Sequence, residues 1–176
     1  MVKSPQKDRL VNKWRDYGKW TCDISRKYLP RVLHSTCFYL GRGLDYGIAC
    51  EACLKLKEIS YIHSESYASG ELKHGPIALI ENGITVISIL TDPNLVEKSI
   101  SNIQEVITRG AKTLVITNQD IDKKMFDEVI CIPKTNTFIS PILSVVPLQL
   151  FAYYIAKEKG LDVDKPRNLA KSVTVE

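Results

Sequence analysis

TCFYLGRGLDYGIACEACLKLKEISYI, residues 36–62, sets the architecture of the chain. Its first five residues, 36–40, predict a short buried strand. The strand ends at Gly41-Arg42-Gly43, and we predict a helix over 45–62. A strand, a glycine turn and a helix in this order aim backbone N–H groups at an anion. The helix has an apolar face made of Ile48, Ala52, Leu56 and Ile59.

The downstream chain repeats this alternation of strands and helices. Near-continuous apolar runs predict buried strands at 84–90, 113–117 and 128–132. Longer periodic segments predict helices at 94–108 and 138–159, shorter helices at 71–81 and 122–126, and one or two helices over 6–33. We expect the end of the helix and a loop after residue 62. This order predicts an α/β fold, a doubly wound parallel sheet between helices, with ligands at the carboxyl ends of the strands.

Composition suits one soluble globular domain. The chain has 176 residues, of which 44% are hydrophobic and 25% charged. It contains no run of about 20 apolar residues for a membrane span, and its first residues lack the apolar stretch of a secretory signal. The net charge of +4 is concentrated early, but base-stacking aromatics are not interleaved with the basic residues. We therefore expect a cytoplasmic protein with no membrane and no nucleic-acid partner.

Cysteines and glycines argue against a cofactor. Five cysteines are odd in number and scattered, which favours free thiols over a disulfide framework. Cys50 and Cys53 match C-x-x-C but lie inside the helix, and no second pair completes a zinc site. A dinucleotide fingerprint needs G-x-G-x-x-G, whereas Tyr46 occupies the position of its third glycine. We expect no metal and no nucleotide cofactor.

Three charged residues of the predicted helix fall on a single face. Glu51, Lys55 and Glu58 are spaced i, i+4 and i+7, which makes them neighbours turn by turn. A solvated helix face is one explanation of this ladder, and a functional site is the other. His74 follows in GELKHGP, residues 70–76, beside a Gly-Pro pair that must bend the chain. Imidazole titrates near neutrality, so His74 is a candidate acid or base.

Two blocks resemble a known enzyme family. The chain resembles the C-terminal half of the isomerase region of glutamine–fructose-6-phosphate aminotransferases in two blocks, GRGLDYGIACEACLKLKEISYIHSESYASGELKHGP (41–76) and PRNLAKSVTVE (166–176). The resemblance covers about residues 38–176. It implies a sugar isomerase (SIS) domain with a flavodoxin-like parallel sheet sandwiched between helices. We expect a helical segment or linker at 1–35, then the SIS domain at 36–176, with an active-site tail over about 161–176.

The resemblance also implies roles for particular residues. Glu58 matches the glutamate that moves a proton between the first and second sugar carbons, and His74 matches the histidine that opens the sugar ring in the neighbouring subunit's site. Lys171 matches the tail lysine that forms a Schiff base with the ketose, Glu51 and Lys55 match supporting residues, and Lys55, Ala170 and Lys171 are expected to bind substrate. A Schiff-base lysine must be deprotonated to attack, so Lys171 needs a buried or cation-rich position.

The implied partners follow from the same resemblance. They are fructose 6-phosphate and glucosamine 6-phosphate, a second copy of the chain in a homodimer, and the preceding SIS and glutaminase domains of the full-length enzyme. Those domains supply the glutaminase cysteine and the Ser/Thr-rich phosphate-binding loop, so we expect weak or no turnover from these residues alone. A non-catalytic sugar-phosphate-binding SIS module is the alternative, and a deaminase or deglycase relative is a third possibility.

Overall fold

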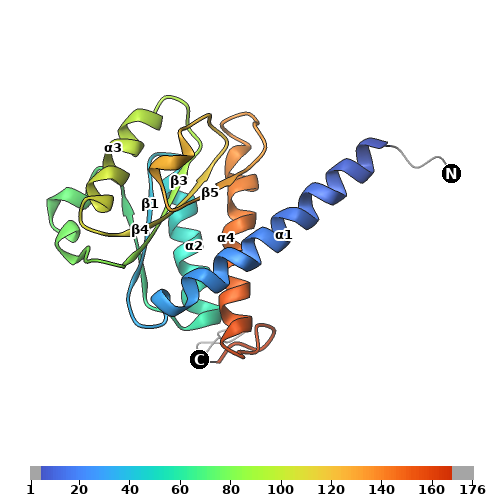
Figure 1. Cartoon of the computed structure of the whole chain (residues 1–176), viewed down its shortest axis with the longest axis horizontal. Coiled ribbons are helices and arrows are strands. Elements are labelled where there is room, and N and C mark those ends of the chain that lie inside the picture. Colours follow the sequence, from blue (N-terminus) through green and yellow to red (C-terminus); the bar gives the residue numbers. More distant parts are fainter. Residues whose placement is uncertain (1–4, 168–176) are drawn as a thin grey trace, which may run out of the picture.

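The computed structural model describes residues 5–167, with side chains described at residue 16 and from residue 18 on (Figure 1). Its longer elements, in chain order, are α1 (Pro5–Val32), β1 (Cys37–Gly41), α2 (Leu44–Ser60), β2 (Ser64–Ala68), β3 (Thr85–Leu90), α3 (Val96–Ile107), β4 (Lys112–Thr117), β5 (Glu128–Cys131) and α4 (Ser140–Glu158). Three short 3-10 helices complete it, η1 (Leu72–His74), η2 (Pro76–Leu79) and η3 (Lys123–Met125).

The sheet has five strands in the order β2-β1-β3-β4-β5. Every neighbouring pair is parallel, and β1 pairs with β2 in the register Cys37↔Ser64 to Gly41↔Ala68. This is the flavodoxin-like order, in which the chain moves outward in one direction after β1 and in the other after β3. The predicted doubly wound parallel sheet is therefore confirmed.

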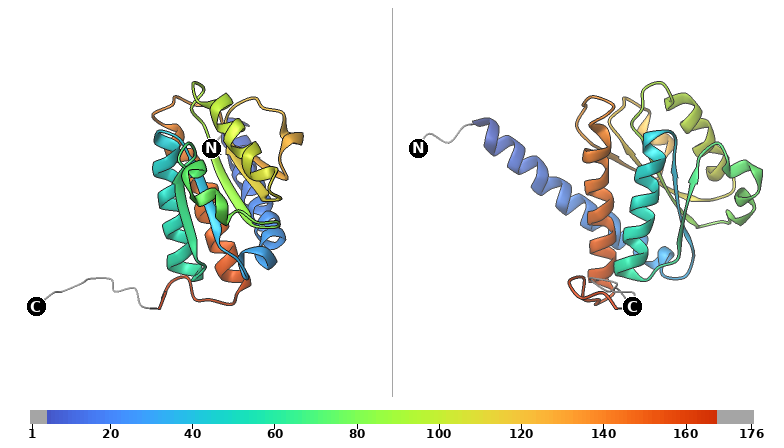
Figure 2. Two further views of the ribbon diagram at one scale, coloured as in Figure 1. Left: turned by 90° about the vertical axis from the view of Figure 1, so that its left-hand side faces the viewer. Right: turned by 180° about the vertical axis from the view of Figure 1, so that it is seen from behind.

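Two hydrophobic cores lie on the two faces of the sheet. Helices α1, α2 and α4 cover one face, where Tyr28, Leu56 and Phe151 are completely or almost completely buried. Helix α3 and the η1–η2 segment cover the other, through Leu72 and Ile103. Figure 1 shows these layers, and Figures 1 and 2 show the first half of α1 projecting beyond the body. Burial of a large apolar side chain contributes about 1.5 to 3 kcal/mol, so helix α2 is held chiefly by its apolar face.

Strand β1 and helix α2 approach each other very closely at Gly41. A Cβ atom added there would lie 2.3 Å from the carbonyl oxygen of Asp45, in the first turn of α2. Only glycine lets the backbone of the strand end and the helix start come this near. The glycine turn in the sequence thus sets the position of the helix that carries the charged ladder.

Two expectations need correction. The segment after residue 62 is not only a loop, because Ser64–Ala68 forms β2. Its sequence, SESYA, is polar because β2 lies at the edge of the sheet and has one neighbouring strand instead of two. The helix expected over 71–81 is instead the two 3-10 helices η1 and η2, which are divided at Gly75, where φ is 151°.

The N-terminal segment forms one helix, α1, which continues through Gly18. Its second half belongs to the core, since Ile24, Tyr28 and Val32 are buried against the sheet. The proposed division of the chain near residue 35 stays a prediction. Over residues 5–167 no helix is long and apolar enough to cross a membrane.

Candidate active site

Helix α2 brings the three ladder residues together. The Lys55 Nζ lies 2.6 Å from Glu58 Oε2 and 3.7 Å from Glu51 Oε1. The side chains of Lys55, Glu58 and Glu51 keep 33%, 24% and 39% of their exposure, so the group lies at the surface but is partly shielded. The predicted apolar face also forms, with Ala52 and Leu56 buried. One helix thus presents a hydrophobic face to the sheet and a charged face away from it.

Lys55 is held as an ammonium ion. Its hydrogen bond to Glu58 raises the pKa of Lys55, against a smaller opposing effect of burial, and the charges of Glu58 and Glu51 add to the rise. Since an amine must be neutral to attack a carbonyl, Lys55 is unsuited to be a nucleophile. It is suited to hold Glu58 in place and to present a positive charge to an anionic substrate.

The end of α2 is tied to the segment that follows α4. Lys159 Nζ donates to the carbonyl oxygen of Ser60, the last residue of the helix. The backbone N–H of Arg167 donates to the hydroxyl of Tyr61 at 2.7 Å, and the Arg167 guanidinium carbon lies 4.2 Å from the centre of the Tyr61 ring. Figures 1 and 2 show this C-terminal segment beneath the ends of α2 and α4. Two cations therefore meet the negative end of the α2 dipole.

The predicted site residue His74 does not join the ladder within one chain. It ends η1, is exposed, and its side chain makes no hydrogen bond or ion pair with the described residues. Its neighbour Leu72 packs into the core on the α3 face of the sheet, whereas Leu56 of α2 packs into the core on the opposite face. The sheet lies between the two segments, so His74 and Glu58 of one chain do not converge.

Two further predicted residues, Ala170 and Lys171, lie outside the described residues. The described chain ends four residues before Lys171, at Arg167. Arg167 contacts Tyr61, the residue that caps α2. Tyr61 follows Glu58 by three residues, and three residues of α-helix rise about 4.5 Å along the helix axis.

The strand ends carry a second polar cluster, which sequence reasoning missed. Asp45 is buried and accepts two hydrogen bonds from Thr91, from the backbone N–H at 2.7 Å and from the hydroxyl at 2.5 Å. Burial raises the pKa of Asp45, and the Thr91 hydrogen bonds oppose that rise. The contact joins the first turn of α2, which follows β1, to the loop after β3. This is the position where the strand order reverses and where α/β proteins bind ligands.

Arg42 lies beside that contact. Its Nε and Nη2 donate to Asn102 Oδ1 at 3.2 and 2.7 Å, and a Cβ atom added at Gly70 would lie 2.9 Å from its Nη2. Arg42 belongs to the predicted glycine turn, which therefore places a guanidinium beside Asn102 and Gly70. That the turn also aims backbone N–H groups at an anion stays a prediction. An acid in the first turn of the helix, at Asp45, was the one signal in the sequence for this cluster.

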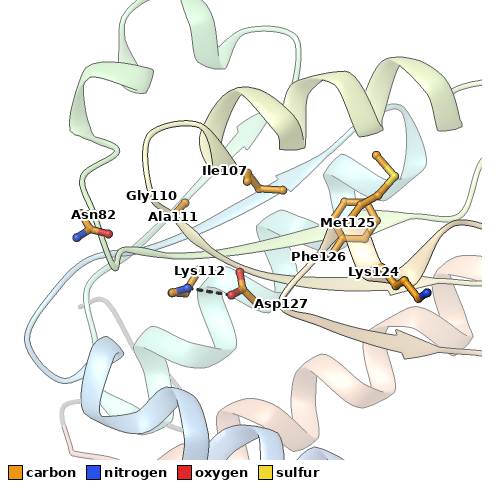
Figure 3. Close-up of a pocket in the computed structure, with 9 residues that line it drawn as sticks. All are labelled: Asn82, Ile107, Gly110, Ala111, Lys112, Lys124, Met125, Phe126 and Asp127. Atoms are coloured by element: carbon orange, nitrogen blue, oxygen red, sulfur yellow. Dashed lines mark hydrogen bonds and ion pairs between the residues drawn. The ribbon is translucent and has the colours of Figure 1, made fainter.

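The surface pocket in Figure 3 lies elsewhere, at the amino-terminal end of β4. It has a volume of about 310 Å³, and a smaller neighbour of about 240 Å³ shares Lys112 and Asp127 with it. Asp127 accepts from Lys112 at 3.0 Å and from the backbone of Thr113 at 2.9 Å, so its charge is already compensated. Neither pocket contains a predicted site residue, and we do not assign the site to them.

Among the described residues no group of His, Cys, Asp and Glu side chains is arranged to bind a metal ion. Within the described part of the chain, none of the five cysteines is in a disulfide bond. Cys53 lies against the hydroxyl of Ser64 and Cys50 against that of Ser66, each at 3.4 Å, so the C-x-x-C pair contacts strand β2.

Comparison with known proteins gives a consistent result. The family model described as "SIS domain" matches residues 34–158. A glutamine–fructose-6-phosphate aminotransferase (isomerizing) from Clostridium perfringens is 65% identical over 143 residues, which cover 79% of this chain and 23% of the relative. The chain therefore spans about a quarter of the length of such curated relatives.

Solved structures agree with this similarity. The C-terminal domain of glucosamine-fructose-6-phosphate aminotransferase from Francisella tularensis has a TM-score of 0.78 and 37% identity, covering 85% of this chain and 42% of that chain. A glucosamine-6-phosphate deaminase from Thermotoga maritima has a TM-score of 0.72 and 26% identity, covering 98% of this chain and 51% of that one.

Proposed function

The chain belongs to the SIS domain family, and within that family we propose that it is the isomerase half of a glutamine–fructose-6-phosphate aminotransferase. In the proposed reaction, fructose 6-phosphate and ammonia from glutamine give glucosamine 6-phosphate and water. The 65% identity to the Clostridium perfringens aminotransferase supports this assignment. We place the protein in the cytoplasm, where its sugar-phosphate substrate would be found.

One observation carries the proposal: the Glu58 carboxylate is held 2.6 Å from the Lys55 ammonium, at the end of α2 to which the C-terminal segment is tied. In this reaction the Lys171 amine forms a Schiff base with the ketose carbonyl and releases water, and ammonia then displaces Lys171 to leave a sugar imine at the second carbon. Glu58 then moves a proton between the first and second sugar carbons, and Lys55 keeps the carboxylate oriented. Glu51 supports Lys55 from the other side, and Ala170 contacts substrate beside Lys171.

His74 acts from a second subunit. The sheet separates His74 from Glu58 in one chain, which supports a role for the histidine in the site of a partner. We therefore propose a homodimer in which each copy supplies His74 to the other. The domains that precede the matched segment in the relatives supply ammonia and the phosphate-binding loop, so turnover depends on them.

Borohydride trapping tests the role of Lys171. The full 176-residue chain is joined behind the domains that precede the matched segment in the Clostridium perfringens relative. With fructose 6-phosphate and borohydride, peptide mapping should find the sugar on Lys171, and Lys171→Ala should remove it. Glu58→Gln should still form the adduct but lose turnover by about 10² to 10⁴-fold. No adduct in the joined protein would refute the Schiff-base role.

A second candidate is the reverse chemistry, release of ammonia from glucosamine 6-phosphate. The similarity to the Thermotoga maritima deaminase, which covers 98% of this chain, favours it specifically. Assays in both directions separate the candidates, since a deaminase releases ammonia without glutamine, whereas the proposed enzyme forms glucosamine 6-phosphate only with an ammonia source. A sugar-phosphate-binding module without activity would bind the sugar and show neither reaction.

A further inference from the structure

We infer that Tyr61 and Arg167 form a latch, a two-residue contact that fixes the start of the C-terminal tail at the end of α2, and that both are positioning residues for Lys171. The inference rests on the proposed role of Lys171. It adds two residues that were not among the predicted site residues, and it rests on contacts between residues that the structure describes.

The backbone of Tyr61 is the first sign of the latch. Tyr61 caps α2 in the left-handed conformation, with φ 58° and ψ 26°, and its N–H donates to the carbonyl of Lys57 at 3.1 Å. It is the only non-glycine with a positive φ among the described residues. Glycine or asparagine usually occupies such a position, because a side chain there costs roughly 1 to 2 kcal/mol. A large aromatic residue at this strained cap suggests that its ring is needed.

Arg167 uses both ends of the Tyr61 side chain. Its guanidinium lies over the ring, 4.2 Å from the centre, and its backbone N–H donates to the ring hydroxyl at 2.7 Å. A cation over an aromatic face is an attractive contact, and the hydrogen bond orients the main chain as well as the side chain. One residue of the tail is therefore fixed in both position and direction.

The latch lies close to Lys171 in the sequence. From Arg167 to Lys171 there are four residues, so the two Cα atoms lie no more than about 14 Å apart. The hydrogen bond to α4 that precedes the latch runs from the Leu161 N–H to the carbonyl of Ala156 at 3.0 Å, and Leu161 is ten residues before Lys171. The latch therefore moves the point of attachment six residues closer to Lys171 in the sequence.

Hydrogen exchange on the 176-residue chain tests whether the latch exists. The Arg167 amide should exchange more slowly in the wild type than in Tyr61→Phe, which keeps the ring but loses the hydroxyl that accepts the bond. Amides within α4 serve as the internal reference and should be unchanged. Equal exchange of the Arg167 amide in both proteins would overturn the latch, whatever the function of the chain.

Trapping in the joined protein tests what the latch does. Arg167→Ala and Tyr61→Ala should each slow borohydride-trapped adduct formation on Lys171 several-fold and lower kcat with little change in KM. Arg167→Lys, which keeps the cation, should restore part of the rate. Lys165→Ala is the matched control, because this exposed lysine is two residues away, and it should trap at the wild-type rate.

The outcomes separate the two proposals. If the wild type forms the adduct on Lys171 and both alanine variants form it equally fast, the latch has no positioning role and the proposed function stands. If the wild type forms no adduct on Lys171, the Schiff-base role is refuted and the positioning role falls with it.

Discussion

Replacing Asp45 with asparagine should destabilise the fold at the carboxyl edge of the sheet. Asp45 is 3% exposed and Thr91 2%, and the two residues are joined by hydrogen bonds of 2.7 and 2.5 Å. This contact ties β1 and α2 to the loop that precedes α3. Asparagine has nearly the same shape but only one acceptor, so it can keep one of the two bonds.

The expected loss of stability follows from the number of hydrogen bonds that asparagine can keep. One buried donor of Thr91 loses its acceptor, and a hydrogen bond to a charged group contributes about 1.5 to 3 kcal/mol. The removal of a buried charge offsets part of this loss, because burial has already made the carboxylate unfavourable. We therefore expect Asp45→Asn to lower the free energy of unfolding by about 1 to 2 kcal/mol at pH 7.

The dependence on pH has a definite sign. Burial raises the pKa of Asp45 above its usual 3.8, so between these two values the folded state holds more protons than the unfolded state. The stability contributed by the protonated carboxyl is then complete below pH 3.8 and is lost as the pH rises through the folded pKa. Asparagine does not titrate, so the stability difference between wild type and variant should shrink from pH 4 to pH 7.

Urea unfolding followed by far-UV circular dichroism measures both effects. Thr91→Val and the double variant complete a mutant cycle, which should give a coupling energy of about 0.5 to 3 kcal/mol between the two side chains. A coupling energy near zero would refute the contact. A stability difference that grows with pH would refute the reasoning about burial, since it would mean that the hydrogen bonds outweigh desolvation.

Two other substitutions test the packing and the charges. Gly41→Ala should lower the free energy of unfolding by about 2 to 4 kcal/mol, because the alanine Cβ would lie 2.3 Å from the Asp45 carbonyl oxygen. A urea unfolding midpoint equal to that of the wild type would show that α2 is not held so close to β1. For Asp127, burial would raise the pKa, but hydrogen bonds from Thr113 and Lys112 outweigh it and lower the pKa. Asp127→Asn should therefore lower the free energy of unfolding by roughly 1 kcal/mol above pH 3.8, and this difference from the wild type should disappear as the pH falls through the lowered pKa. Thermal unfolding at pH 7 and pH 3 measures the difference, and a difference that persisted at low pH would contradict the prediction.

Much of the fold was predictable because local pattern and global position agree. Strands β3 and β4 are buried on both faces of the sheet, so their apolar runs are almost uninterrupted and readable. Strand β2 was missed because an edge strand needs less apolar surface, and SESYA is mostly polar. The η1–η2 segment was misjudged because Gly75 divides it, an effect of one backbone angle and not of composition.

The sequence by itself determined the parallel α/β fold and the ladder, because spacings of three and four residues place Glu51, Lys55 and Glu58 together on any α-helix. Tertiary structure alone decided the contacts across long separations. Asp45 meets Thr91 46 residues later, and Tyr61 meets Arg167 106 residues later. No local pattern encodes such pairs, since they depend on strand order and on which face each helix covers. The same layering places the sheet between His74 and Glu58.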